Sequence, residues 1–346
     1  MKICITGSTG LIGSVAAQYF LGKKHQVVGI DNNMRSKFFG TNAATTLTKK
    51  SLKKYPNYTH LNLDIRSAAK INELFENQKF DAIIHCAGQP SHDRAAQIPL
   101  LDFEVNTLGT LTLLEATRHH CPQAVFIFTS TNKVYGDNPN RLSLKELEKR
   151  YMYRDKNFKG VAENMSIDQN LHSLMGVSKA SADLYVQEYG LNFGLKTTCL
   201  RLGCVTGAAH HSVKLHGFLS YLIKSLVHQR SYQIIGFKGK QVRDQLDAYD
   251  LASAMLEIIK KPGRGKIFNL GGGMANNASI LELIEIISQK LKIKSKITYQ
   301  SQSRKGDHIC YITDLTKFKK TYPKWQISKS LEQIIDEIIE YEQKLG

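Results

Sequence analysis

Short apolar runs rich in branched residues alternate along the chain with longer amphipathic stretches. Six of the short runs predict strands, at residues 2–6, 26–31, 58–63, 82–85, 124–129 and 196–200, and the stretches between them have helical periodicity. Alternation of strand and helix favours an α/β fold with a doubly wound parallel sheet of the Rossmann type.

The pattern loosens after residue 202 and ends in a compact unit at 265–273 and two predicted helices at 279–292 and 328–344. We expect residues 1–204 to form mainly the Rossmann domain. Residues 205–346 should form mainly a smaller C-terminal lobe that binds substrate, with parts of 236–273 returning to the first domain. The polar segment 138–168 is expected to be a long irregular insertion.

Composition narrows the class of protein. The 346 residues are 42% hydrophobic and 22% charged, which is typical of a globular chain. The N-terminus does not look like a signal peptide, and no apolar run is long enough to span a membrane, so we expect a cytoplasmic protein without a membrane partner. Six scattered cysteines without a CxxC pair predict reduced, mostly buried thiols.

The formal charge of +17 would attract an anionic ligand. The lysines are dispersed and form no basic helix, so nucleic acid is not expected as a partner. His210, His211 and His216 invite a metal interpretation, but no acidic or thiol residues accompany them at suitable spacing. We therefore expect no metal.

A glycine-rich loop follows the first predicted strand and opens a helix. Gly7 permits a tight turn, Gly10 lets the backbone approach a pyrophosphate, and Gly13 allows close helix–strand packing. The N–H groups and dipole at the helix N-terminus favour a phosphate there. The predicted dinucleotide contacts in this loop are Gly7, Thr9, Gly10, Leu11, Ile12 and Gly13.

Asp31 ends the second predicted strand, where a carboxylate can accept from both adenosine ribose hydroxyls, with Asn32 beside it. An Asp that merely caps a turn is the alternative. The carboxylate would repel a 2′-phosphate, and the first cation after it, Arg35, is four residues away, so NAD is favoured over NADP. Asn32 and Arg35 are also predicted to contact the cofactor. Asp64 and Ile65, after the third strand, are predicted to contact adenine.

These motifs make the sequence resemble the extended short-chain dehydrogenase/reductase family over nearly the whole chain. The resemblance rests on the glycine loop, Asp31, Ala87-Gly88-Gln89, Asn106 and Ser178-Lys179. It implies that Ala87, Gly88, Gln89, Asn106 and Lys179 contact NAD. Within the family, the segments STNKVYGD (130–137) and GKQVRD (239–244) resemble the CDP-paratose 2-epimerases, also called CDP-tyvelose epimerases.

The family's catalytic set is a Ser or Thr with a Tyr and a Lys spaced YxxxK. Thr131 and Lys179 match this set, but Met175 stands where the family has Tyr and has no titratable proton. Some large sugar-nucleotide dehydratases resemble this sequence in carrying Met there. A deprotonated Lys179 could act as the base while Thr131 holds the sugar oxygen.

A histidine or cysteine near the site could instead relay the proton. His85, Cys86, His92 and His172 are the candidates, with a structural role as the alternative for each, and His172 is preferred. In the family's dehydratase branch an Asp-Glu acid–base pair follows the Thr. Asn132 and Lys133 occupy these positions here, which disfavours 4,6-dehydration.

On the substrate side, Arg243 resembles the family's diphosphate-binding arginine, and Arg304 and Asp307 resemble a second nucleotide contact. Surface ion pairs are the alternative. The remaining predicted substrate contacts are Gln89, Ser91, His92, Thr131, Asn132 and Lys133.

The resemblance implies an NAD-dependent nucleotide-sugar epimerase, with a CDP-sugar favoured, that acts by transient oxidation of a ring carbon. The alternatives are a nucleotide-sugar dehydratase or reductase, and a catalytically silent NAD(H)-binding protein. The resemblance also implies a homodimer.

Overall fold

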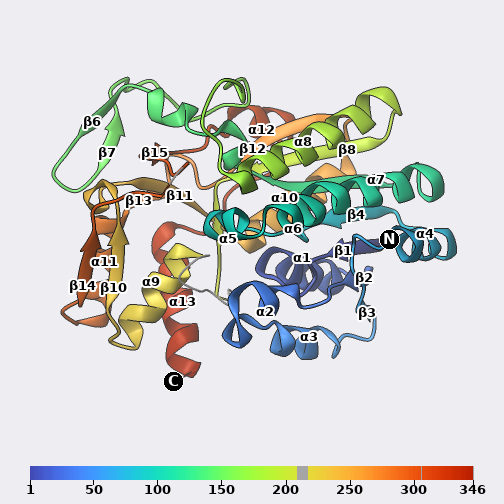
Figure 1. The fold of residues 1–346 in the computed structure, drawn as a ribbon. Coiled ribbons are helices and arrows are strands. Elements are labelled where there is room, and N and C mark those ends of the chain that lie inside the picture. Colours follow the sequence, from blue (N-terminus) through green and yellow to red (C-terminus); the bar gives the residue numbers. More distant parts are fainter. Residues whose placement is uncertain (209–216, 305, 346) are drawn as a thin grey trace. The chain divides into compact units, whose positions relative to one another are not determined.

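The computed structural model describes residues 1–208, 217–304 and 306–345 (Figure 1). The chain packs as two compact units, and each is discontinuous in sequence. The first contains residues 1–134, 174–201 and 248–268, and the second contains residues 135–173, 202–247 and 269–346. Residues 135–173, which the sequence analysis assigns to the first 204 residues, thus pack within the second unit.

A seven-stranded sheet organises the first unit, in the order β12-β8-β5-β4-β1-β2-β3. The strands are parallel, so the predicted α/β doubly wound sheet is confirmed. The strands are β1 Lys2–Thr6, β2 Gln26–Ile30, β3 Tyr58–Leu61, β4 Ala82–His85, β5 Val125–Thr131, β8 Lys196–Leu202 and β12 Lys266–Leu270. The six predicted strands are present, and the seventh comes from the predicted compact unit at 265–273.

The order of the strands reverses between β1 and β4. Thr6 pairs in register with Ile30 of β2 and His85 of β4, so these three strands end at the same level. In open α/β sheets, ligands bind outside the carboxyl ends of the strands at such a reversal. The loops after β1, β2 and β4 therefore form the expected binding edge.

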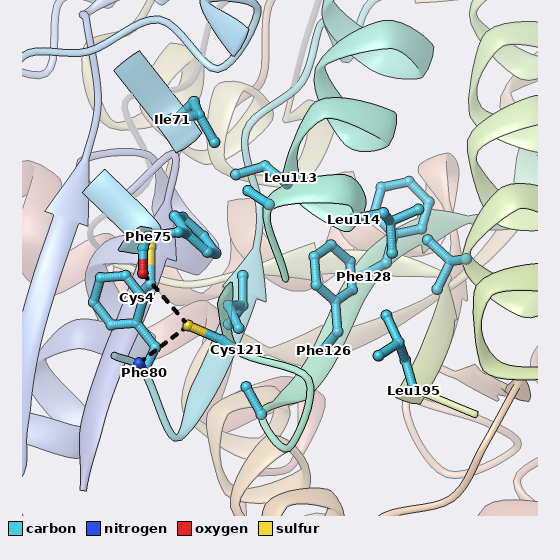
Figure 2. Packing of buried hydrophobic residues seen from close by; sticks show 14 of the residues in the cluster. Cys4, Ile71, Phe75, Phe80, Leu113, Leu114, Cys121, Phe126, Phe128 and Leu195 are labelled. Atoms are coloured by element: carbon cyan, nitrogen blue, oxygen red, sulfur yellow. Dashed lines mark hydrogen bonds between the residues drawn. The ribbon is translucent and has the colours of Figure 1, made fainter. Parts of the chain in front are cut away.

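Helices α4 (Ala68–Asn77), α7 (Gly109–His120) and α8 (Leu174–Asn192) pack on the sheet over one hydrophobic cluster. Figure 2 shows Phe75, Phe126 and Phe128 in this cluster, with the thiol of Cys121 next to Phe75 and Phe80. That sulfur accepts a hydrogen bond from the Phe80 backbone N–H at 3.5 Å.

The other helical layer contains α1 (Leu11–Gly22), α3 (Thr46–Leu52) and α10 (Ala248–Lys260), which pack against one another. Tyr19 of α1 meets Tyr249 of α10 edge to face, with ring centroids 5.1 Å apart. Short elements complete the unit: α2 Met34–Phe39, α5 His92–Gln97, α6 Pro99–Phe103 and a π-helical turn at Glu104–Leu108.

The second unit is built around strand β11 (Val242–Asp247), which pairs with β13 (Asn277–Ser279), β15 (Cys310–Tyr311) and β9 (Cys204–Thr206). Strands β10 (Tyr232–Ile235) and β14 (Ile297–Gln300) form a separate parallel pair. A second hydrophobic cluster joins α9 (Phe218–Val227), α11 (Ile280–Leu291) and α13 (Leu331–Leu345). The two closing helices predicted from the sequence correspond to α11 and α13; a shorter helix, α12, spans Thr316–Thr321.

The segment expected to be irregular, 138–168, is partly ordered. It contains an antiparallel hairpin of β6 (Leu144–Glu146) and β7 (Tyr151–Tyr153). Tyr153 packs with Val242, Cys310 and Ile312, so an apolar side chain in this polar stretch anchors the hairpin. The expectation was therefore wrong for these strands, because their pairing depends on this tertiary contact.

All six cysteines are free thiols, and Cys4, Cys121, Cys199 and Cys310 are buried, as expected. Among the helices that the structure describes, none has the length and apolar character needed to cross a membrane. His210, His211 and His216 lie outside the described residues. Within the described ranges, no group of three or more His, Cys, Asp or Glu side chains could hold a metal ion.

Candidate active site

The loop between β1 and α1 is held by backbone contacts that only glycine permits. Gly7 has φ +64°, and a Cβ added there would lie 2.7 Å from the Ala87 nitrogen. Its N–H donates to the Ile30 carbonyl at 2.8 Å. A Cβ on Gly13 would lie 2.1 Å from the Gly7 carbonyl oxygen, so the first turn of α1 packs directly on the loop. These contacts fix the loop at the sheet edge.

The N-terminus of α1 is suited to an anion. Gly10 is the N-cap in extended conformation, no side chain caps the helix, and its first turn has no acidic residue. The N–H groups and dipole of this turn, which begins with Leu11 and Ile12, therefore favour a phosphate. Thr9 hydrogen-bonds through Oγ1 to the Thr45 hydroxyl at 2.7 Å, which leaves its backbone to shape the loop.

Asp31 immediately follows β2 and ties the glycine loop to the next turn. Its carboxylate accepts from the Thr9 N–H at 3.0 Å and from the Asn33 N–H at 2.8 Å. The side chain is only partly buried, and a carboxylate accepts through several lone pairs. Asp31 thus both caps a turn and offers acceptors beside the loop, so the two interpretations of this residue are compatible.

Asp64 takes part in a local charge network. Its carboxylate binds Arg66 at 2.8 Å and accepts from Asn32 Nδ2 at 3.2 Å. The hydrogen bond from Arg66 lowers the pKa of Asp64. Ile65 is buried, and its side chain would meet a Cβ placed on Gly109. The Asp64 and Asn32 side chains therefore stabilise the loops that follow β2 and β3. Their contact with a cofactor stays a prediction.

Arg35, the first cation after Asp31, lies in α2 with its guanidinium 5.2 Å from the centre of the Phe39 ring. Burial lowers the pKa of Arg35 to about 10. The arginine is thus packed on an aromatic ring of its own helix, a contact that accounts for its position without a phosphate.

A buried polar network joins the loop after β4 to helices α6 and α8. The Asp102 carboxylate accepts from Ser178 Oγ at 2.6 Å and from Gln89 Nε2 at 2.7 Å. Asn106, in the π-helical turn, accepts from the Gln89 backbone N–H at 2.8 Å and donates to Ser178 Oγ at 3.0 Å. Burial raises the pKa of Asp102. The network fixes the loop at 87–89 relative to the residue before Lys179.

The side chain of Gln89 is held within this network. The side chain is fully buried, its Oε1 accepts from the Ser91 N–H, and its Nε2 donates to Asp102 and to the Ser91 carbonyl. Both ends of the amide are hydrogen-bonded within the protein, and the contact of Gln89 with a cofactor or substrate stays a prediction. Asn106 is a positioning residue in this structure.

Lys179 lies on the inner side of α8 with 9% of its surface exposed. Its Nζ donates to the Thr129 carbonyl at 2.9 Å and lies 4.3 Å from the centre of the Phe128 ring. A Cβ on Gly88 would stand 3.6 Å from this nitrogen, so the glycine leaves room beside the amine. Burial lowers the pKa of Lys179 to about 8, so about one-tenth of the amine is neutral at pH 7 and about half at pH 8.

Met175 is buried one helical turn before Lys179 in the same helix. Thr131 ends β5, and its Oγ1 accepts from the Lys133 N–H at 3.3 Å. Thr131 lies two residues beyond Thr129, whose carbonyl receives the lysine, so the strand alternation directs both threonine side chains to one face. Asn132 is buried and Lys133 partly exposed at the start of the next turn. The end of β5 thus adjoins the lysine.

Of the alternative proton relays, His85 is structural. Its ring is buried between the Thr6 hydroxyl at 2.7 Å and the Thr110 hydroxyl at 2.9 Å, and burial sets its pKa well below the usual value. Burial raises the pKa of Cys86 to about 12, which keeps the thiol protonated. His92 begins α5, where Ser91 caps the helix by accepting from the Arg94 N–H.

His172 is partly buried in the segment before α8 and belongs to the second unit. Its predicted role in proton transfer stays a prediction.

Arg243 and Asp307 meet within the second unit. Arg243 is 7% exposed in β11, and its guanidinium pairs with the Asp307 carboxylate at 2.6 Å and donates to the Val242 and His308 carbonyls. The Asp307 N–H donates to the Arg304 carbonyl at 3.2 Å. The structure therefore brings the three predicted nucleotide contacts of this unit together.

Sequence reasoning missed Asp102 and the carbonyl of Thr129. Asp102 stands four residues before Asn106, a spacing that places two polar side chains on one helical face and was an available signal. The Thr129 carbonyl could not be found from residue types, because any residue at that position has one.

The glycine turn, the uncapped helix terminus and the acceptor after β2 define a dinucleotide-binding Rossmann-type fold, and these residues fit NAD. The sequence profile of the NAD dependent epimerase/dehydratase family matches residues 3–271. The chain belongs to this family, and NAD is its cofactor.

Two curated relatives represent the two branches of the family. The chain is 32% identical over 324 residues to the CDP-paratose 2-epimerase of Salmonella typhi, which covers 92% of each protein. It is 25% identical over 356 residues to dTDP-glucose 4,6-dehydratase 1 of Escherichia coli, which covers 99% of this chain and 92% of the relative.

Among solved structures, a UDP-glucuronic acid 4-epimerase from Bacillus cereus, in complex with UDP-glucuronic acid and NAD, superposes with a TM-score of 0.83 at 24% identity over the whole of both chains. This similarity supports the fold.

Proposed function

We propose that this protein is an NAD-dependent nucleotide-sugar epimerase that acts by transient oxidation of a ring carbon, most similar in activity to the CDP-paratose 2-epimerases. The observation that carries the proposal is the buried Lys179, whose amine is held by the Thr129 carbonyl and has a pKa of about 8. It supplies a proton acceptor where the family's tyrosine is replaced by Met175.

In this mechanism the neutral amine of Lys179 takes the proton of a sugar hydroxyl while the carbon that bears it is oxidised. Thr131 Oγ1 holds the same oxygen. A neutral amine can still donate to the Thr129 carbonyl and accept the proton through its lone pair, so the observed hydrogen bond is compatible with this role. NAD, when bound, supplies a reversible hydride acceptor for the ring carbon. Lys179 returns the proton when the hydroxyl forms again on the other face.

The cofactor would be held by elements with different roles. The glycine loop and the first turn of α1 would receive the pyrophosphate, and Asp31 would accept from the adenosine ribose. The buried network of Asp102, Asn106 and Ser178 would hold the loop at 87–89 in position. Ion pairing with Asp307 and backbone acceptors preorders Arg243, which suits it to a diphosphate.

Epimerisation is favoured over dehydration by the residues that follow Thr131. Asn132 cannot protonate a leaving hydroxyl, and a protonated Lys133 is a poor base for a carbon-bound proton. The identity to the Salmonella typhi epimerase, 32%, also exceeds the identity to the Escherichia coli dehydratase, 25%. A CDP-sugar is the substrate that this similarity favours.

We also propose a homodimer through the first unit. Apolar side chains at Leu174, Val177, Leu184 and Leu191 of α8 are each between 47% and 66% exposed. They recur at intervals of three and seven residues, which makes a continuous stripe suited to a second copy of the same helix. Leu184→Glu should therefore lower the mass in solution to that of a monomer, whereas Leu47→Glu, at an exposed site on α3, should not.

The experiment that tests the function is incubation of the purified protein with CDP-, UDP-, GDP- and dTDP-sugars in heavy water, followed by mass and proton spectra. A stereoisomer without net change of cofactor and without solvent deuterium is expected. Loss of water or uptake of deuterium would assign the protein to dehydration or deprotonation chemistry instead. Full turnover by Lys179→Met would exclude the lysine as base.

A second candidate function rests on Met175. A protein that lacks the family's tyrosine could bind NAD(H) and a nucleotide-sugar without turnover. In that case the panel gives tight binding of both ligands with no product, and the Lys179→Met variant binds them as the parent does.

A further inference from the structure

Gln245, in strand β11 of the second unit, is a polar side chain without an evident structural purpose. It is 0% exposed, and neither its Nε2 nor its Oε1 has a hydrogen-bond partner among the described residues. A buried amide that lost its water without gaining a partner destabilises the folded state. A ligand that offers both a donor and an acceptor would satisfy the two atoms of this one side chain.

The strand places this amide beside the predicted diphosphate contact. Gln245 follows Arg243 by two residues in β11, so both side chains lie on the same face, roughly 7 Å apart along the strand. Across the sheet, Arg243 pairs in register with Tyr311 and Gln245 with Cys204. The face that holds the guanidinium therefore continues directly to the amide.

The two atoms of the amide specify what the ligand must offer. Nε2 needs an acceptor and Oε1 needs a donor, whereas an ionised phosphate only accepts. A hydroxyl group does both. In a nucleoside diphosphate the pentose is attached to the phosphate that a nearby arginine would bind, and it carries hydroxyls within reach of a neighbouring side chain.

We propose that Gln245 binds the ribose hydroxyls of the nucleoside diphosphate that Arg243 holds, and that it selects ribonucleotides over 2′-deoxyribonucleotides. This inference rests on the proposed function, since it assumes a nucleotide-sugar at Arg243. It makes Gln245 a specificity-determining residue whose unpaired amide destabilises the free protein and is satisfied by the substrate.

The test uses Gln245→Met, which keeps the length of the side chain and removes both polar atoms. Thr198→Val is the matched control, because Thr198 in β8 of the first unit is also buried with a hydroxyl that has no partner among the described residues. Affinities for the four common ribonucleoside diphosphates and their 2′-deoxy counterparts are measured by calorimetry with excess NAD present, so that the cofactor site is filled. Thermal midpoints of the free proteins are measured in parallel.

Both variants should melt at a higher temperature than the parent, because each loses an unsatisfied buried group. Only Gln245→Met should bind the preferred ribonucleoside diphosphate more weakly, by about tenfold, and lose most of the parent's preference over the 2′-deoxy form. Unchanged affinity in Gln245→Met would overturn the inference and leave the proposed function standing. An equal loss for both forms of the nucleotide would overturn the ribose contact. A parent protein that binds no nucleoside diphosphate would contradict the proposed function, and this inference with it.

Discussion

The glycine loop after β1 and the buried surroundings of Lys179 lie in the same unit but are built in opposite ways. In the loop, function resides in the backbone: Gly7 and Gly13 allow contacts at which any Cβ would collide with main-chain atoms. Around Lys179, the proposed chemistry depends on one side chain, whose pKa is lowered by burial and whose amine donates to the Thr129 carbonyl. Both arrangements join distant parts of the chain: Gly7 packs against the backbone of Ala87, and Lys179 binds the carbonyl of Thr129, fifty positions before it.

This difference teaches which part of a site tolerates change. A backbone cradle fails if any of a few small residues gains atoms, because the main chain cannot move aside. A buried lysine can keep its position while the pKa of its amine changes with the residues around it. Met175, which our proposal places where the family has a tyrosine, falls in the second kind of region, where the surrounding scaffold persists.

The largest effect should come from breaking the cradle. Gly13→Val places atoms against the Gly7 carbonyl, so we expect loss of NAD binding and a destabilisation of about 2–4 kcal/mol. Gly22→Ala is the control in the same helix, since a Cβ there meets nothing within 4 Å, and it should stabilise the protein by about 0.5–1 kcal/mol. Calorimetric titration with NAD and thermal melts check both. If Gly13→Val binds NAD as tightly as the parent does, NAD binding does not depend on the close packing of the glycine loop.

Lys179→Met should lower the turnover of the enzyme and raise the stability of the folded protein. Turnover should fall by about 10²–10⁴-fold, as expected for removal of a general base. In the parent protein, turnover at pH values below about 8 should decline as the amine becomes protonated. Initial rates across pH 6–10 measure this dependence.

The stability of the parent protein should depend on pH in the same range. Burial depresses the Lys179 pKa from 10.5 to about 8, so the unfolded chain binds more protons between these values, and the free energy of unfolding rises with pH across that window. Below pH 8 the depressed pKa of Lys179 lowers the free energy of unfolding by its full amount, which is on the order of 3 kcal/mol. Denaturant melts of Lys179→Met should lack this dependence, and a parallel slope in both proteins would contradict it.

Asp102→Asn tests the network that joins the two regions. The new amide presents N–H groups to donors on Gln89, Asn106 or Ser178, so we expect a loss of about 1–3 kcal/mol and weaker NAD binding. Asp81→Asn is the control, because Asp81 accepts from the Lys2 N–H at an exposed position and should matter less. Urea melts of the two variants compare the effects directly. Equal losses would show that Asp102 has no special role.

The smallest effect should be on the choice of cofactor. Asp31→Ser removes the carboxylate that disfavours a 2′-phosphate, so the preference for NAD over NADP should fall by about tenfold to a hundredfold. Asp155→Ser, which removes an exposed carboxylate that also accepts a backbone N–H, should leave the preference unchanged. The measurement is the dissociation constant of each variant for NAD and for NADP. If the ratio of the two constants is the same in Asp31→Ser as in the parent, Asp31 only caps a turn.

The same contrast explains what the sequence could predict. The parallel sheet and the glycine loop follow from apolar periodicity and from residues adjacent in the chain, and the structure contains both. The hairpin at β6 and β7 was not predicted, because Tyr153 is stabilised by packing against residues about ninety or more positions away. The buried environment of the Gln89 side chain was also missed, since its pairing with Asp102, thirteen positions away, depends on how α6 packs.

The discontinuous first unit has a consequence for how the protein folds during synthesis. Helix α1 is completed early, but its packing partner α10 and the edge strand β12 are made only after residue 247. At about 5–20 residues per second, the ribosome leaves the apolar side of α1 without this cover for roughly ten seconds or more. The nascent chain should therefore depend on chaperones in this interval, and its slowest folding step should be the docking of α10 and β12 onto a sheet that is otherwise complete.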